Sequence, residues 1–272
     1  MATKQFKRVL YISQEIFPYL PESNLALISR RIPEDIQPAG WETRTFMPKF
    51  GAINERRNQL HEVIRLSGMN LIIDDTDHPL IIKVASIQSA RMQIYFIDND
   101  DYFARKGIGA DENGEEYLDN DERSIFFVRG VMETIKKLRW TPDVIHCHGW
   151  ISALSPLYIK KVYCDDPFFK NTKVVYSLLN DDFQRPFRKS FGKKLKMEGI
   201  TDKDIAKIKD KEVTYETLSE IAMDYSDAVV QLSENVNPAV LEYAKKSGKH
   251  VLPYYPHDQL ATQFAKFYDS LM

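Results

Sequence analysis

Short apolar segments alternate with segments of helical periodicity along most of this 272-residue chain. Continuous apolar runs of strand length occur at residues 8–13 (RVLYIS), 144–147 (VIHC) and 174–178 (VVYSL). Apolar side chains at helical spacing occur at residues 122–139. Strands that are apolar on both faces need helices on both sides of their sheet. The alternation therefore predicts an α/β fold with a mostly parallel, doubly wound sheet.

The chain between residues 71 and 97 follows a different pattern. Three apolar runs, LIID, LIIKVA and MQIYFI, stand only a few residues apart, and this spacing predicts an antiparallel hairpin extension of the sheet. Residues 183–211 are polar and basic, and we expect exposed loop and helix there. The chain has neither an internal repeat nor a low-complexity linker, so we expect residues 1–272 to form a single Rossmann-like domain. Further strands are expected at 42–47 and 228–232, and further helices at 23–37, 152–163, 214–225, 234–247 and 258–271.

Charge and cysteine content exclude several classes of function. The formal net charge is −2, so no basic excess favours nucleic acid or an anionic membrane. The apolar runs are too short to span a bilayer, and residues 1–7 lack the apolar centre of a signal peptide. Cys147 and Cys164 are the two cysteines, so no disulfide framework is implied. These features predict a cytoplasmic protein.

Ligands of open α/β sheets bind beyond the carboxyl ends of the strands. One such end reads His146, Cys147, His148, Gly149, Trp150. Side chains alternate along a strand, so the two histidines share one face and Cys147 takes the other, which disfavours a metal site. His148, at the strand end, is placed to hydrogen-bond a ligand. The alternative is that both histidines are packed and satisfied inside the core.

Other common site patterns are missing. The first strand is followed by a loop with a negative charge and no glycine, so neither the dinucleotide nor the P-loop pattern is present, and we expect no cofactor. The acidic stretch at 98–101 lacks the glycine and glutamate of a calcium loop. The basic segment 185–211 carries interleaved acidic residues, which favours a solvated surface over a nucleic-acid patch.

Five segments, in order along the chain, carry a family resemblance: VLYISQEIFP (9–18), RTFMPKFG (44–51), YLDNDER (117–123), PDVIHCHGW (142–150) and YSDAVVQLSE (225–234). Together they resemble the N-terminal domain of bacterial glycogen synthases and plant starch synthases, which are retaining glycosyltransferases of the GT-B fold. The resemblance implies transfer of glucose from ADP-glucose to an α-1,4-glucan between two Rossmann-like domains, of which the N-terminal one mainly holds the acceptor.

The chain departs from the family pattern where the donor would bind. The family's first loop reads K-T-G-G-L-x-D, and the aligned positions here place Pro21 at the lysine and Ser23 and Asn24 at the paired glycines. Glu22 adds repulsion toward a diphosphate. The chain also ends where the family's C-terminal nucleotide-binding domain would begin, so we expect that domain to be absent. A preorganised donor group is typically worth about 3 kcal/mol to a developing anion, so these losses are heavy.

Four residues remain as candidate substrate-binding residues: His148, Asn180, Trp150 and Glu15. The resemblance implies that His148 contacts the sugar, whereas Glu15 could instead cap a loop and Trp150 could fill the core. No catalytic residue and no metal ligand is assigned.

These observations predict a glycogen/starch-synthase-like protein of α-1,4-glucan metabolism. It would bind an α-glucan or maltooligosaccharide, be inactive alone, and need a second glycosyltransferase chain as a partner. The alternative is a non-catalytic glucan-binding or regulatory module. The missing phosphate loops argue against an unrelated nucleotide-binding enzyme. We expect the final helix to pack on the domain, although docking on a partner is also open.

Overall fold

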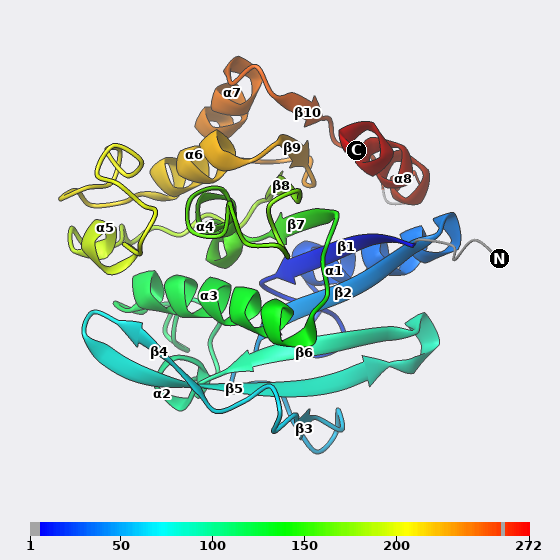
Figure 1. Ribbon diagram of the computed structural model, residues 1–272, viewed down its shortest axis with the longest axis horizontal. Helices are drawn as coiled ribbons and strands as arrows, with labels where there is room; N and C mark the ends of the chain where they lie inside the picture. Colours follow the sequence, from blue (N-terminus) through cyan, green and yellow to red (C-terminus); the bar gives the residue numbers. More distant parts are fainter. Residues whose placement is uncertain (1–5, 257–258) are drawn as a thin grey trace.

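The computed structural model describes residues 6–256 and 259–272, which are built around one ten-stranded sheet (Figure 1). The strand order is β10-β9-β8-β7-β1-β2-β6-β5-β3, and β4 pairs with β5. The strands are β1 (Lys7–Ser13), β2 (Trp41–Pro48), β3 (His61–Glu62), β4 (Met69–Ile73), β5 (Thr76–Ile87), β6 (Met92–Asp98), β7 (Val144–His148), β8 (Lys173–Leu178), β9 (Ala228–Gln231) and β10 (His250–Leu252).

The sheet is parallel from β6 to β10 and antiparallel where β5 meets β6, β4 and β3. This arrangement confirms the expected α/β class with a mainly parallel sheet and an antiparallel extension. The order along the sheet reverses between β1 and β7, because β2 and β6 lie on one side of β1 while β7, β8 and β9 follow on the other. In doubly wound sheets such a reversal opens a crevice at the carboxyl ends of the two central strands.

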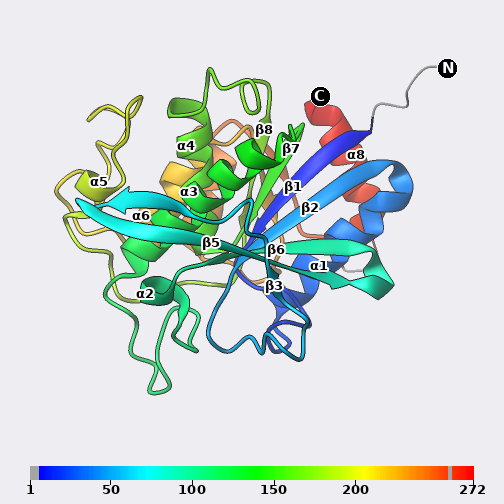
Figure 2. The same ribbon diagram turned by 60° about the horizontal axis from the view of Figure 1, so that its bottom comes forward.

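Helices cover both faces of the sheet (Figure 2). One face packs against α3, α4 and α6, and the other against α1 and α8. The helices are α1 (Asn24–Ile36), α2 (Asp100–Phe103), α3 (Asn120–Leu138), α4 (Ser155–Lys161), α5 (Phe191–Lys194), α6 (Tyr215–Tyr225), α7 (Pro238–Lys246) and α8 (Leu260–Leu271), with short 3₁₀ turns η1 (Gln37–Ala39), η2 (Gln88–Ala90) and η3 (Trp150–Ser152).

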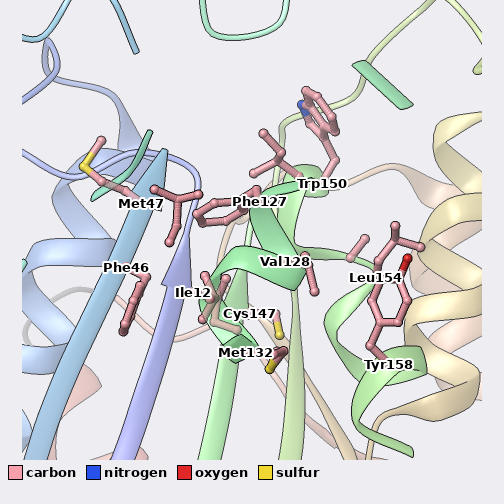
Figure 3. Close-up of a cluster of buried hydrophobic side chains, with 14 of the residues drawn as sticks. Ile12, Phe46, Met47, Phe127, Val128, Met132, Cys147, Trp150, Leu154 and Tyr158 are labelled. Carbon is pink, nitrogen blue, oxygen red and sulfur yellow. The ribbon is translucent and has the colours of Figure 1, made fainter. Parts of the chain in front are cut away.

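The larger core lies between α3 and the central strands (Figure 3). Side chains of α3 face apolar side chains of the strands there: Phe127, Val128 and Met132 from the helix, and Ile12, Phe46, Met47 and Cys147 from the sheet. The helix approaches the sheet closely at Gly130, where an added Cβ would lie 2.9 Å from Ile97 and 3.0 Å from Leu80. This close packing fixes α3 against the strands that frame the carboxyl-end edge.

Three features differ from the sequence expectations. The run MQIYFI, expected only as a hairpin strand, also pairs in parallel with β2, because β6 is both the end of the hairpin and the third strand of the parallel sheet. The strands β3 and β10 were missed, since two or three residues carry little periodicity. The basic segment 183–211 contains buried apolar side chains that pack under its charged surface, among them Phe187, Leu195 and Ile208.

The last helix packs on the domain, as expected. Phe264 and Tyr268 of α8 are fully buried against α1 and the strands. Asp258, the expected first residue of this helix, lies outside the described residues, as do residues 1–5 of the predicted polar N-terminus.

Candidate functional site

A cavity of about 460 Å³ opens at the carboxyl-end edge, beside the point where the strand order reverses. The loops after β1, β8 and β9 form its walls, and the start of α1 closes one side. Its lining residues are Gln14, Glu15, Ser23, Asn24, Leu25, Leu179, Asn180, Asp181, Asp182, Ser233, Glu234, Asn235 and Tyr254. The ends of three parallel strands thus meet in one cavity. We call it the switch-point cavity.

Glu15 lies between the loop after β1 and the first turn of α1. The Ser23 hydroxyl donates to Glu15 Oε2 at 2.6 Å, and the Gln14 amide donates to Glu15 Oε1 at 3.3 Å. Ser23 is also the N-cap of α1, because its Oγ accepts the backbone N–H of Ala26 at 2.9 Å. Ser, Thr, Asp and Asn are the preferred residues at this position. Glu15 therefore helps to fix the start of α1 and still faces the cavity.

Asp181 is held by two neutral donors. The Tyr215 hydroxyl donates to Oδ1 and the Trp150 backbone N–H donates to Oδ2, both at 2.7 Å. Burial raises the pKa of the Asp181 carboxyl to about 6; the two hydrogen bonds oppose this shift, while the charges of Asp182 and Glu15 add to it. A carboxyl with this pKa changes its charge close to neutral pH.

Asp182 is the second carboxyl of this loop. Its Oδ2 accepts from the Asn237 side-chain amide at 2.8 Å, and the same amide donates to Glu216 at 2.9 Å. Asn237 also caps α7 through its own carbonyl oxygen. The Asp182 carboxylate is therefore oriented by a residue that is itself fixed at a helix start.

The predicted residues fall into two groups. Glu15 and Asn180 line the switch-point cavity, and Asn180 is exposed to solvent there. His148 and Trp150 are not among its lining residues within the described part of the chain. The geometry thus brings together the first pair and leaves the second pair below the cavity wall.

His148 is fully buried at the end of β7. Its Nδ1 lies 3.1 Å from the Ser29 hydroxyl and 3.4 Å from the Ser13 hydroxyl. Burial lowers the pKa of His148 to about 3, so the ring is neutral at physiological pH. Direct contact between His148 and a sugar stays a prediction.

His146 lies on the same face of β7, as the alternation predicts, with its ring centroid 4.4 Å from that of His148. Both of its nitrogens have partners: Nδ1 lies 2.6 Å from the Tyr268 hydroxyl and Nε2 lies 2.7 Å from the Ser177 hydroxyl. Burial, and to a smaller extent the neighbouring His148, holds the pKa of His146 well below its ordinary value. His146 is therefore a packed core histidine that joins β7 to α8.

Trp150 is buried beneath the loop after β8. Its ring packs edge-on against Phe183 and Phe187, with centroids 5.6 and 5.8 Å away. Its backbone N–H contacts the cavity lining by donating a hydrogen bond to Asp181. A contact between the Trp150 ring and a ligand stays a prediction.

Sequence reasoning missed Asp181 and Asp182 as cavity residues. The signal was present, because both directly follow Asn180 at the end of an apolar run. Carboxylates at a strand's carboxyl end are candidates for a site in this type of fold. Gln14 was also missed, since its neighbour Glu15 carried the more recognisable chemistry.

Comparison with known proteins identifies the family of this chain. Residues 8–252 match the profile of the family described as the starch synthase catalytic domain. The chain belongs to this family. Among curated relatives, the glycogen synthase of Chlorobium limicola is 41% identical over 181 residues, which is 66% of this chain and 37% of the relative. The glycogen synthase of Chlorobaculum tepidum is 42% identical over 200 residues, 73% of this chain and 41% of the relative.

A solved structure shows the same fold. The catalytic domain of starch synthase IV from Arabidopsis thaliana, bound to ADP and acarbose, superposes with a TM-score of 0.73 at 14% identity, over 92% of this chain and 51% of that one. The chain thus spans about 40% of the length of the curated relatives described above.

The described residues show neither a metal-binding cluster nor a membrane-spanning helix. In residues 6–256 and 259–272, no group of three or more histidine, cysteine, aspartate or glutamate side chains is arranged to hold a metal ion. None of the helices in the described part of the chain has the length and apolar character that crossing a bilayer requires.

Proposed function

We propose that this chain is the glucan-holding lobe of an α-1,4-glucan glucosyltransferase system, that it acts as one cytoplasmic domain, and that it needs a second glycosyltransferase chain for transfer. The observation that carries the proposal is the lining of the switch-point cavity. Carboxylates, amides and hydroxyls converge there at the reversal of strand order, and the described residues contribute neither lysine nor arginine to the wall. Such groups suit the hydroxyls of a sugar, which both donate and accept hydrogen bonds.

The relatives support a role in glucan metabolism. Two of them are glycogen synthases, and the similar plant structure holds ADP and acarbose. In our proposal Glu15 and Asn180 contact the sugar directly. His148 and Trp150 support the site from below, His148 through the end of β7 and Trp150 through Asp181.

The same lining is unsuited to a nucleotide diphosphate. A diphosphate leaving group must be neutralised as its charge develops, usually by cations or backbone N–H groups. Here Pro21 and the exposed Glu22 precede α1, and Glu15 and Asp181 add negative charge to the cavity. Transfer therefore requires positive groups that the described cavity residues do not supply, which is the reason for a partner chain.

Two measurements test the proposal. Titration calorimetry with maltoheptaose should show binding, and Asn180→Ala should weaken it about fivefold, the effect of losing one neutral hydrogen bond. Asn113→Ala, in the exposed turn between α2 and α3, is the matched control and should bind like the wild type. Absence of maltoheptaose binding by the folded wild type would refute the proposal.

The second measurement is incorporation of labelled glucose from ADP-glucose into glycogen. The chain alone should give none, and its complex with a second glycosyltransferase chain should give turnover. Turnover by the chain alone would contradict the need for a partner. A complex that binds glucan without any transfer would favour the alternative of a non-catalytic glucan-binding or regulatory module, which the polar lining also suits.

A further inference from the structure

Two residues that line the switch-point cavity each have a buried acceptor atom without a hydrogen-bond partner among the described residues. These atoms are Oε1 of Gln14 and Oδ1 of Asp182. Gln14 is only 4% exposed, and its amide nitrogen is already used by Glu15. A buried acceptor without a donor is unfavourable, because nothing replaces the hydrogen bond that it made to water. The orphaned groups of this cavity therefore lack donors, and a ligand that satisfies them must bring O–H or N–H groups.

The charges of the cavity also disfavour an anionic ligand. Its four carboxyl groups are Glu15, Asp181, Asp182 and Glu234, and the first three accept from neutral groups of the protein. The cation–carboxylate pairs found in the described residues include none of them. Like charges in one concave site create a negative potential that repels an anionic ligand.

The start of α1 does not offset this potential. A helix N-terminus carries partial positive charge and is a common place for phosphate to bind. Here the Glu15 carboxylate lies 2.6 Å from the hydroxyl of the N-cap residue Ser23. The protein thus places its own negative charge beside the start of α1.

We propose that the switch-point cavity selects uncharged, hydroxyl-rich saccharides and excludes phosphorylated ones, with Gln14 and Asp182 accepting the ligand's hydroxyls. Glu15 and Asp181 provide the repulsion. This inference rests on the proposed glucan-binding function and adds its specificity: the ligand is a neutral saccharide, and the specificity-determining residues are Gln14, Asp182, Glu15 and Asp181.

The first test measures the two acceptors. Maltotriose binding by calorimetry should weaken about tenfold in Asp182→Asn, because a hydrogen bond to a charged acceptor is lost. Gln14→Met, which keeps the length of the side chain and removes its acceptor, should weaken binding about fivefold. Asp165→Asn makes the same charge change at an exposed site away from the cavity and should leave binding unchanged. Urea unfolding of each variant confirms that it is folded.

The second test measures exclusion by charge with a matched ligand pair. Wild type should bind maltose at least tenfold more tightly than maltose 1-phosphate at low salt, and this ratio of affinities should decrease at 0.5 M salt. In the double variant Glu15→Gln/Asp181→Asn the ratio should already be smaller at low salt. Equal or tighter binding of maltose 1-phosphate by the wild type would overturn the inference.

These outcomes are distinguishable from failure of the proposed function. If the wild type binds neither maltotriose nor maltoheptaose, the proposed function fails. If the wild type binds maltotriose but Asp182→Asn and Gln14→Met bind it equally well, the glucan function stands and the assignment of the two acceptors is wrong.

Discussion

Carboxylates gather at the carboxyl-end edge of the sheet in two regions that hold them differently. Near β5 and β6, Lys83 pairs with Asp98 and with Glu55, both at 2.8 Å, and Lys49 pairs with Glu55 at 2.7 Å. We call these four residues the lysine–carboxylate network. In the switch-point cavity, on the other side of β1, the carboxylates accept from a hydroxyl, an amide or a backbone N–H instead.

The pKa values of Asp181 and Glu55 record the difference, whereas burial raises the pKa of Asp98 although the hydrogen bond and charge of Lys83 oppose the shift. Burial raises the pKa of Asp181 to about 6. Glu55 also loses solvent, but the hydrogen bonds and charges of Lys49 and Lys83 hold its pKa below the ordinary value. A carboxylate that is neutralised within the fold has no need of a ligand. One that is held only by neutral donors keeps its charge available to a binding partner.

The largest effect on stability is expected from breaking the lysine–carboxylate network. Lys83→Met leaves Asp98, which is 3% exposed, without its ion-pair partner. Removing one member of a buried pair costs about 3 kcal/mol, so the free energy of unfolding in urea should fall by about that amount.

Adding Asp98→Asn to this variant should recover part of the loss, because the unpaired charge is then removed. If Lys83→Met changes the free energy of unfolding by less than about 0.5 kcal/mol, the network contributes little to stability, and the contrast with the cavity does not hold.

The next effect is expected at Gly149, which joins β7 to η3 and lies against Gln14 of the cavity wall. This residue has φ +89°, and an added Cβ would lie 2.7 Å from Cβ of Gln14. Gly149→Ala should therefore lower the free energy of unfolding by about 2 kcal/mol and weaken maltotriose binding by displacing Gln14.

Gly114→Ala is the matched control for this prediction. Gly114 has a similar φ of +82° but no atom within 4 Å of an added Cβ, so it should show only the smaller backbone strain and normal binding. Equal losses in the two variants would indicate that Gly149 does not position Gln14.

A smaller effect is expected in the pH dependence of stability. The folded-state pKa of Asp181, about 6, exceeds the unfolded value of about 4. Between these values the folded chain keeps a proton that the unfolded chain has released, so this residue's contribution to stability is lost as pH rises. The unfolding free energy of the wild type minus that of Asp181→Asn should fall by about 1 kcal/mol from pH 5 to pH 7.

The groups that face Asp181 are Tyr215, the Trp150 backbone N–H, Asp182 and Glu15, with Tyr176 nearby. The tyrosines stay protonated in this range, because burial raises their pKa values further. A difference that rises with pH would mean that a cation neutralises Asp181, as happens in the lysine–carboxylate network.

The smallest effect is expected at the rim of the cavity. Glu234 lines the cavity but is exposed to solvent, where water and salt screen its charge. Glu234→Gln should change the free energy of unfolding by less than about 0.5 kcal/mol and the ratio of maltose to maltose 1-phosphate affinities by less than about twofold. A larger change in that ratio would place the selective charge at the rim and not at Glu15 and Asp181.

The amino-acid sequence by itself determined the α/β class, the parallel strands, the antiparallel extension and the family. Apolar runs such as RVLYIS and VIHC carry their periodicity locally, so they predict β1 and β7 without any knowledge of their neighbours. The strand-end rule also predicted the edge at which Glu15 and Asn180 meet, because parallel strands bring their carboxyl ends together.

Only the tertiary structure decided which charges are paired. Asp98 ends an apolar run and Asp181 follows one, and nothing in the local sequence distinguishes them. They differ because β5 brings Lys83 beside Asp98, whereas α6 brings Tyr215 beside Asp181. His148 and Trp150 show the same limit, since their burial depends on Ser29 of α1 and Phe187 of a distant loop. Apolar periodicity is a local property of the sequence. Charge pairing and burial depend on residues far apart in sequence, which meet only when the sheet and its helices assemble.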